Sequence, residues 1–147
     1  MAFASEDARS LAAVLDEIIP PSDDGRMPGA GEAGLVSHVE AQVAKSPELE
    51  PVLLQGLAAL REQAGGDFDA LGADARRDAL NAIAAGQPGF LPTLVFHTFT
   101  GYYQLPRVLE ALGLEARPPH PKGHELEAGD LSLLDPVRER GKHYRDV

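Results

Sequence analysis

The chain lacks cysteine and tryptophan, and only five Phe and three Tyr are present among its 147 residues. Without cysteine, structural disulfides, thiolate nucleophiles, cysteine-ligated zinc and cysteine-held iron–sulfur clusters are excluded. No apolar run approaches the roughly 20 residues of a membrane-spanning helix, and no apolar or twin-arginine leader opens the sequence. We expect no membrane insertion and a cytoplasmic location, or a periplasmic one if an exported partner carries the chain.

Positive charge is also scarce. Thirteen Lys and Arg stand against 23 Asp and Glu, which gives a net charge of −10. Residues 1–114 hold 7 cations and 16 anions, a balance of −9, whereas residues 115–147 hold 6 and 7, a balance of −1. A body this acidic repels phosphate backbones and anionic lipid surfaces. Nucleic acids and membranes are therefore not expected partners.

The residues that are present favour helices. Ala, Leu and Val dominate the apolar set, and apolar residues recur at three- and four-residue spacing. The predicted helices span 5–19 (capped by Ser5 and ended by Pro20 and Pro21), 32–45, 46–64 (capped by Ser46), 73–85, 88–104 and 106–112. We predict an all-α fold, with a single small bundle of five to six helices over residues 1–114.

The most apolar of these helices is 88–104, and its side chains are predicted to serve two purposes. Phe90, Leu94, Val95, Phe99 and Tyr103 are expected to line it as it packs through the middle of the bundle. Tyr102 and Tyr103 are adjacent, so on a helix they point about 100° apart. One can enter the core while the other reaches a neighbouring protein.

Residues 115–147 break the helical pattern. Prolines cluster at the start of this stretch, periodic apolar residues are few, and the charges nearly balance. The pattern is typical of an extended, Pro-rich C-terminal arm, partly polyproline II, that lies on another protein. The predicted partner interface comprises His97, Tyr102, Tyr103, Pro106, Pro118, Pro119, Pro121 and Lys122.

The sequence does not indicate a catalytic or metal-binding site in this chain. No G-x-S-x-G, S-x-x-K or H-E-x-x-H motif occurs, so the common nucleophile and zinc signatures are missing. His120 and His124 could gather a metal in a loop, but an exposed polar turn is the commoner interpretation. His97 lies among apolar neighbours, where a packed histidine is commoner than a catalytic one. His38 falls on the polar side of its helix and is expected to be solvated.

An ordered set of short motifs resembles the gluconate 2-dehydrogenase subunit 3 family over most of residues 10–125. The motifs are LDEIIP at 15–20, Asp24, PGA at 28–30, AGLV at 33–36, Phe90, FHT at 96–98, GYY at 101–103, Pro106 and LG at 112–113. Within them, the resemblance gives structural roles to Ile19, Pro20, Pro28, Gly29, Gly101 and Gly113.

The resemblance implies a bacterial-type, non-catalytic accessory subunit of an oxidoreductase complex. Its partner would be an FAD-dependent sugar or alcohol dehydrogenase of the glucose–methanol–choline (GMC) class, sometimes with a c-type cytochrome. The FAD would lie in that partner, so no cofactor, metal or catalytic residue is expected in this chain. Two alternatives stay open: a stand-alone metal-binding protein or enzyme that uses His97 or His120 and His124, and a self-associating helical adaptor.

Overall fold

The computed structural model describes residues 3–118, 120–123 and 125–142. In these ranges every regular element is a helix, which confirms the all-α prediction. The helices are α1 (Ser5–Ile18), α2 (Leu35–Lys45), α3 (Leu49–Ala64), α4 (Ala73–Ala84), α5 (Phe90–Tyr102), α6 (Pro106–Ala111) and α7 (Asp135–Arg138), with 3-10 turns η1 (Phe68–Ala70) and η2 (Leu131–Leu134). None of the helices in these ranges has the length and apolar character that crossing a membrane requires.

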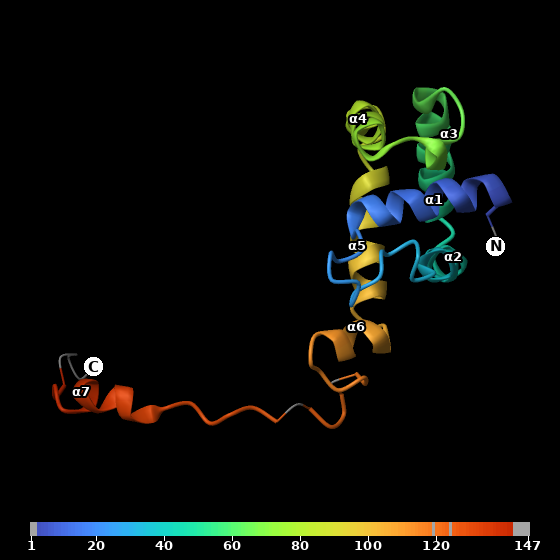
Figure 1. The fold of residues 1–147 in the computed structure, drawn as a ribbon. Helices are drawn as coiled ribbons and strands as arrows, with labels where there is room; N and C mark the ends of the chain where they lie inside the picture. The colour runs from blue at the N-terminus through green and yellow to red at the C-terminus, as the bar shows by residue number, and fades with distance from the viewer. Residues whose placement is uncertain (1–2, 119, 124, 143–147) are drawn as a thin grey trace. The chain divides into compact units, whose positions relative to one another are not determined.

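The chain divides into two compact units, Met1–Arg117 and Pro118–Val147, which we call the bundle and the C-terminal unit. In the bundle, α1 crosses between the α3–α4 pair and α2, and α5 runs past it (Figure 1). Because α1 contacts α2, α3, α4, α5 and η1, its apolar face forms the centre of the core. Leu11, Val14 and Leu15 on that face are completely buried.

The helix ends show which local signals the chain uses. Helix α1 stops before Pro20, and α3 ends at Gly65 with a φ of 70°, both as predicted. The predicted serine caps are wrong. Ala4 and Glu48 occupy the N-cap positions of α1 and α3, and neither helix has a side-chain cap. Helix α2 begins at Leu35 rather than 32, because a turn ending at Gly34, with a φ of 81°, precedes it.

The loop between α1 and α2 packs unusually closely on α1. Asp16 Oδ1 accepts hydrogen bonds from the backbone N–H groups of Gly31 at 2.7 Å and Glu32 at 3.2 Å. A Cβ at Gly31 would lie 2.1 Å from the carbonyl oxygen of Ala12, and one at Gly29 would lie 2.3 Å from Asp16 Oδ1. Glycine is needed at both positions because any side chain would overlap α1.

Three other motif residues make hydrogen bonds within the bundle. The carbonyl of Ile19 accepts from the Ala30 N–H at 2.9 Å, which closes the base of the loop. The carbonyl of Pro28 accepts from the Tyr102 hydroxyl at 2.6 Å, which ties the loop to α5. Gly113, with a φ of 74°, follows α6, and its N–H donates to Glu110.

The C-terminal unit is not extended throughout its described residues. It contains two short helices, η2 and α7, which the sequence pattern did not indicate. Among its described residues none is buried. It therefore has helical structure but no core of its own in the part of the chain that the structure describes.

Candidate protein-interaction surface

Helix α5 lies in the longest uncharged stretch of the chain. Residues 79–106 contain no Asp, Glu, Lys or Arg, although charged residues make up 24% of the whole sequence. The helix itself, FLPTLVFHTFTGY, is apolar on nearly every side. A helix of this kind is normally buried all round. In the isolated chain, however, only half of it is covered.

The covered half of α5 packs into the bundle against α1, α2 and α3. It carries Phe90, Leu94, Thr98, Gly101 and Tyr102. Leu94 and Tyr102 are completely buried, and the Thr98 hydroxyl donates to the Leu94 carbonyl at 2.6 Å. Gly56 on α3 makes room for Phe90, because a Cβ there would lie 2.0 Å from its ring. This side is fixed by close contacts along its length.

The opposite half of α5 is exposed, and we call it the α5 aromatic face. Its members are Val95, Phe96, Phe99 and Tyr103, with exposed fractions of 41%, 63%, 45% and 43%. At 100° per residue all four fall within an arc of about 100°, so they form one continuous stripe. The rings of Phe99 and Tyr103 lie 5.9 Å apart between centroids. Four large apolar side chains thus share one solvent-facing stripe.

The aromatic face corrects the sequence prediction for this helix. Phe90 and Leu94 are buried as expected, but Val95, Phe99 and Tyr103 point away from the bundle. Phe96, the most exposed of the four, was absent from the predicted interface. A helical-wheel projection would have separated the two halves, but uniform apolarity gave no indication of which half faces the core.

The two adjacent tyrosines have opposite environments. Tyr102 is completely buried, and its hydroxyl donates to the Pro28 carbonyl. Burial raises the pKa of that hydroxyl, with a smaller contribution from Tyr103, so it remains protonated and a donor. Tyr102 has no surface to offer a partner, and its assignment to the interface is corrected to a core position. Tyr103 is exposed beside Phe99, and Pro106 is exposed at the start of α6.

His97 and His38 meet where α5 packs on α2. The His38 ring occupies the space beside Gly101, where a Cβ would lie 2.7 Å from its Cδ2 atom. His38 is therefore partly buried, which corrects its predicted solvation. Burial lowers the pKa of both imidazoles. The nearby positive charge of Lys45 lowers the pKa of His38 further. His38, when protonated, likewise lowers the pKa of His97. Both rings are therefore mainly neutral at pH 7, and the His97 side chain is partly buried.

The residues predicted in the arm belong to the C-terminal unit. Pro118, Pro121 and Lys122 are exposed, and Pro119 lies outside the described residues. His120 is in an exposed turn, and its predicted companion His124 also lies outside the described residues. Within the described part of the chain, no group of three or more His, Asp or Glu side chains is arranged to hold a metal.

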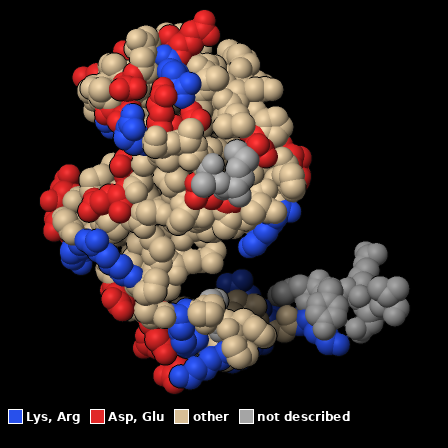
Figure 2. Space-filling model, turned by 90° about the vertical axis from the view of Figure 1, so that its right-hand side faces the viewer, with Lys and Arg blue, Asp and Glu red and all other residues tan. Residues whose placement is uncertain are grey.

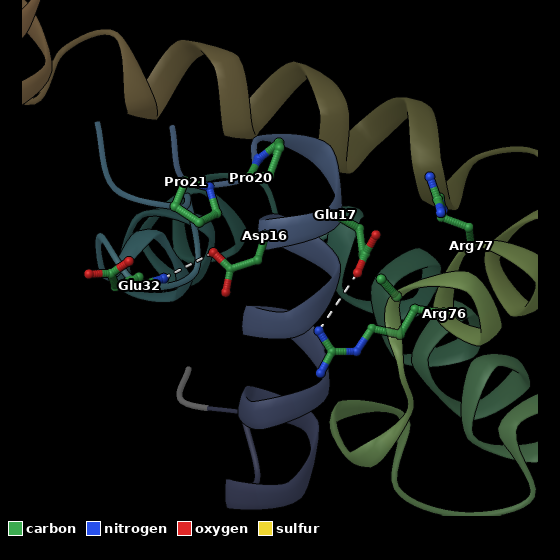
Figure 3. A pocket seen from close by; sticks show the side chains of 8 residues that line it. Asp16, Glu17, Pro20, Pro21, Glu32, Arg76 and Arg77 are labelled. Atoms are coloured by element: carbon green, nitrogen blue, oxygen red, sulfur yellow. Dashed lines mark hydrogen bonds and ion pairs between the residues drawn. The ribbon is translucent and has the colours of Figure 1, made fainter. Parts of the chain in front are cut away.

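A cleft of about 510 Å³ lies in the bundle between the end of α1, the following loop and α4 (Figure 3). Its lining includes Pro20 and Pro21 and the charged side chains of Asp16, Glu17, Glu32, Arg76 and Arg77. Figure 3 shows Glu17 opposite Arg76, with Glu17 Oε1 and Arg76 Nη1 3.7 Å apart. Arg76 Nη2 also donates to the Asp69 carbonyl at 2.5 Å. The Asp16 contacts and the Glu17–Arg76 pair join α1 to the loop and to α4, and the Arg76–Asp69 bond joins α4 to η1, so we assign the cleft a structural role.

The rest of the surface is charged in the way the composition implies. Figure 2 shows carboxylates spread over one face of the molecule, with fewer Lys and Arg side chains between them. Several cations are paired, as in Arg61, which contacts Asp7 at 2.6 Å and Glu6 at 2.7 Å. Compared with that surface, the α5 aromatic face stands out because it is both apolar and uncharged.

A family model described as Gluconate 2-dehydrogenase subunit 3 matches residues 5–115. The matched range contains α1 to α6 and ends before the C-terminal unit. It agrees with the family to which the motifs pointed. No curated protein and no solved structure matches the chain significantly.

Proposed function

Because the chain belongs to the gluconate 2-dehydrogenase subunit 3 family, we propose that it is a non-catalytic subunit that binds and stabilises an FAD-dependent, GMC-type sugar or alcohol dehydrogenase. Its docking surface is the α5 aromatic face. The dehydrogenase holds the FAD and catalyses the reaction. Where a c-type cytochrome is present, that cytochrome holds the haem. The observation that carries the proposal is the exposure of one half of a helix whose composition is that of a buried one.

The aromatic face has the composition of an interface centre. Aromatic residues are enriched and charged residues are depleted in the fully buried part of protein interfaces. Burying apolar surface contributes roughly 25 cal/mol per Å² before the costs of association. Since residues 79–106 have no charged side chain, covering this stripe removes no ionised group from water. The desolvation penalty that weakens charged interfaces is therefore small here.

The same contact accounts for stabilisation of the partner. A stripe that is apolar on this chain requires an apolar strip on the dehydrogenase, and such a strip favours aggregation when it is uncovered. Because the accessory chain binds the folded dehydrogenase and not the unfolded one, binding shifts the folding equilibrium of the dehydrogenase towards the native state. The accessory chain therefore raises the amount of folded dehydrogenase without taking part in its reaction.

Co-expression with a GMC-type dehydrogenase from the same genome tests the proposal. Phe96→Asp places a charge at the most exposed position of the stripe, where the bundle itself loses little. We expect the variant to keep its helix content, to lose co-purification, and to lower the yield of FAD-loaded dehydrogenase. Asn81→Asp is the matched control, because it adds the same charge at an exposed site on α4 within the same uncharged stretch.

Three results would contradict the proposal. If Phe96→Asp and Asn81→Asp gave equal dehydrogenase yields, the α5 aromatic face would not be part of the interface. Light scattering that shows a stable dimer of the isolated chain, broken by Phe96→Asp, would instead identify a self-associating adaptor. A stoichiometric metal or flavin in the purified chain alone would contradict the non-catalytic assignment.

A further inference from the structure

His97 lies on the border between the covered and the exposed halves of α5. Its side chain is partly buried, whereas the preceding Phe96 is the most exposed member of the α5 aromatic face. The two rings meet edge-on, with their centroids 5.2 Å apart and their planes at 79°. In residues 79–106, His97 is also the one side chain whose charge can change near neutral pH. A protein that covers Phe96 therefore also removes water from the exposed part of a titratable ring.

The inner side of His97 meets α2, where a second imidazole is packed. The His38 ring fills the space beside Gly101, where a Cβ would lie 3.0 Å from Nε2. The side-chain amide nitrogen of Gln42 lies 3.5 Å from the same Nε2, at the limit of a hydrogen bond. Burial is the main cause that lowers the pKa of both rings, and the charges that add to it, Lys45 on His38 and protonated His38 on His97, are positive.

No anion offsets a proton on this pair. Helix α5 has no Asp or Glu, and among the described residues no carboxylate of a neighbouring helix contributes to the pKa of either ring. Removing a charged imidazole from water without an opposite charge beside it is costly. A partner that covers the α5 aromatic face therefore binds the chain with neutral His97 more tightly than the chain with protonated His97.

We propose that His97 makes docking of the dehydrogenase on the α5 aromatic face dependent on pH, so that the complex is tight at neutral pH and weakens when its surroundings become acidic. The inference rests on the proposed function and concerns the regulation of the same surface. Burial already lowers the pKa of His97 from 6.5 in the free chain, so docking well above this pH displaces no proton. At lower pH a proton must leave before the partner can cover the ring, and the affinity falls.

The experiment measures binding of the full-length chain to the purified dehydrogenase at pH 7.5 and 5.5. We expect His97 to weaken binding of the wild-type chain roughly 3-fold to 10-fold at the lower pH. His97→Gln keeps a polar side chain that does not take up a proton, and its decrease should be smaller by that factor. His120→Gln is the matched control, because it removes a histidine from an exposed turn of the C-terminal unit and should keep the wild-type decrease.

Titratable groups of the dehydrogenase affect all three chains equally, so the difference between the chains reports His97. Circular dichroism at both pH values checks that each chain stays folded. A second measurement does not depend on the affinity of a variant. The His97 ring is titrated by NMR in histidine-labelled wild-type chain, free and bound, with its signal assigned by comparison with free His97→Gln. We expect a lower pKa for His97 in the complex than in the free chain.

The possible results separate this inference from the proposed function. A wild-type chain that does not bind the dehydrogenase at pH 7.5 would overturn both. If Phe96→Asp abolishes binding but wild type and His97→Gln weaken equally at pH 5.5, with the same His97 pKa free and bound, only the pH dependence is overturned and the α5 interface stands. A higher pKa for His97 in the complex would also overturn the inference, because the partner would then place an anion beside the ring.

Discussion

The bundle and the C-terminal unit use the same apolar residue types with opposite outcomes. In the bundle, leucines such as Leu11, Leu15 and Leu57 are almost completely removed from water, because several helices meet around α1. In the C-terminal unit, Leu131, Leu133 and Leu134 are exposed on a helical stretch with nothing to pack against among the described residues. The difference teaches that leucine content alone decides neither burial nor stability. The number of surrounding elements decides both.

Removing one leucine from each unit should give the largest contrast. Leu15→Ala opens a cavity at the centre of the bundle, and we expect a loss of about 2–5 kcal/mol in the free energy of unfolding. Leu133→Ala removes a mostly exposed side chain, and we expect a change within about 0.5 kcal/mol. Urea unfolding followed by circular dichroism measures both. Equal losses would mean that the C-terminal unit is packed in the free chain, and the comparison would fail.

Adding one methyl group to each unit sharpens the contrast at a smaller scale. At Gly31 the new Cβ would lie 2.1 Å from the Ala12 carbonyl oxygen, which is backbone and cannot rotate away. We expect Gly31→Ala to destabilise the bundle by about 1–3 kcal/mol. At Gly129 no atom lies within 4 Å of the added Cβ. Gly129→Ala should therefore leave the thermal midpoint almost unchanged, and a matching decrease would show an unrecognised contact there.

A pH dependence confined to the bundle is the smallest expected effect. The pKa values of His38 and His97 are lowered from 6.5 in the folded chain, mainly by burial. Just below pH 6.5 the unfolded chain then binds more protons than the folded one, so stability falls as the pH decreases. Well above pH 6.5 both states are neutral at these groups and the contribution is constant. Melting curves at pH 7.5 and 5.5 measure the decrease.

The histidine effect has its own control. His38→Gln combined with His97→Gln removes both titrating rings, so the part of the decrease that comes from these groups should disappear. A double variant that retains the whole wild-type slope would assign the pH dependence to carboxylates elsewhere. The C-terminal variants Leu133→Ala and Gly129→Ala should keep the wild-type slope, because neither alters the contact between α2 and α5.

Sequence patterns predicted the fold well where one physical signal dominates. The periodic apolar residues of α1 and the pair Pro20–Pro21 identify both its buried face and its end. Gly65 ends α3 because its left-handed backbone favours glycine. The serine caps failed because a cap depends on where the preceding turn places the side chain, and Ser46 lies before a turn that continues to Glu48.

The candidate site was less accessible to sequence reasoning. The motifs identified α5, and adjacency predicted that Tyr102 and Tyr103 would diverge, but not which of them enters the core. That choice depends on the Pro28 carbonyl, 74 residues away in the chain. Short helices such as η2 and α7 span too few turns to show a period. The sequence therefore did not reveal two kinds of feature. One is contacts between segments that are distant in the chain, and the other is helices of a single turn.

The hydrogen bond between Tyr102 and Pro28 has a consequence for the surface above it. The bond holds the Tyr102 side chain against the loop at the last turn of α5, and the exposed Tyr103 ring packs edge-on against it, with the ring centroids 5.4 Å apart. A surface that is already ordered loses little conformational freedom on association, and preorganisation of this kind strengthens binding without any additional contact. In the proposed complex, the buried tyrosine would strengthen binding in this way without touching the partner itself.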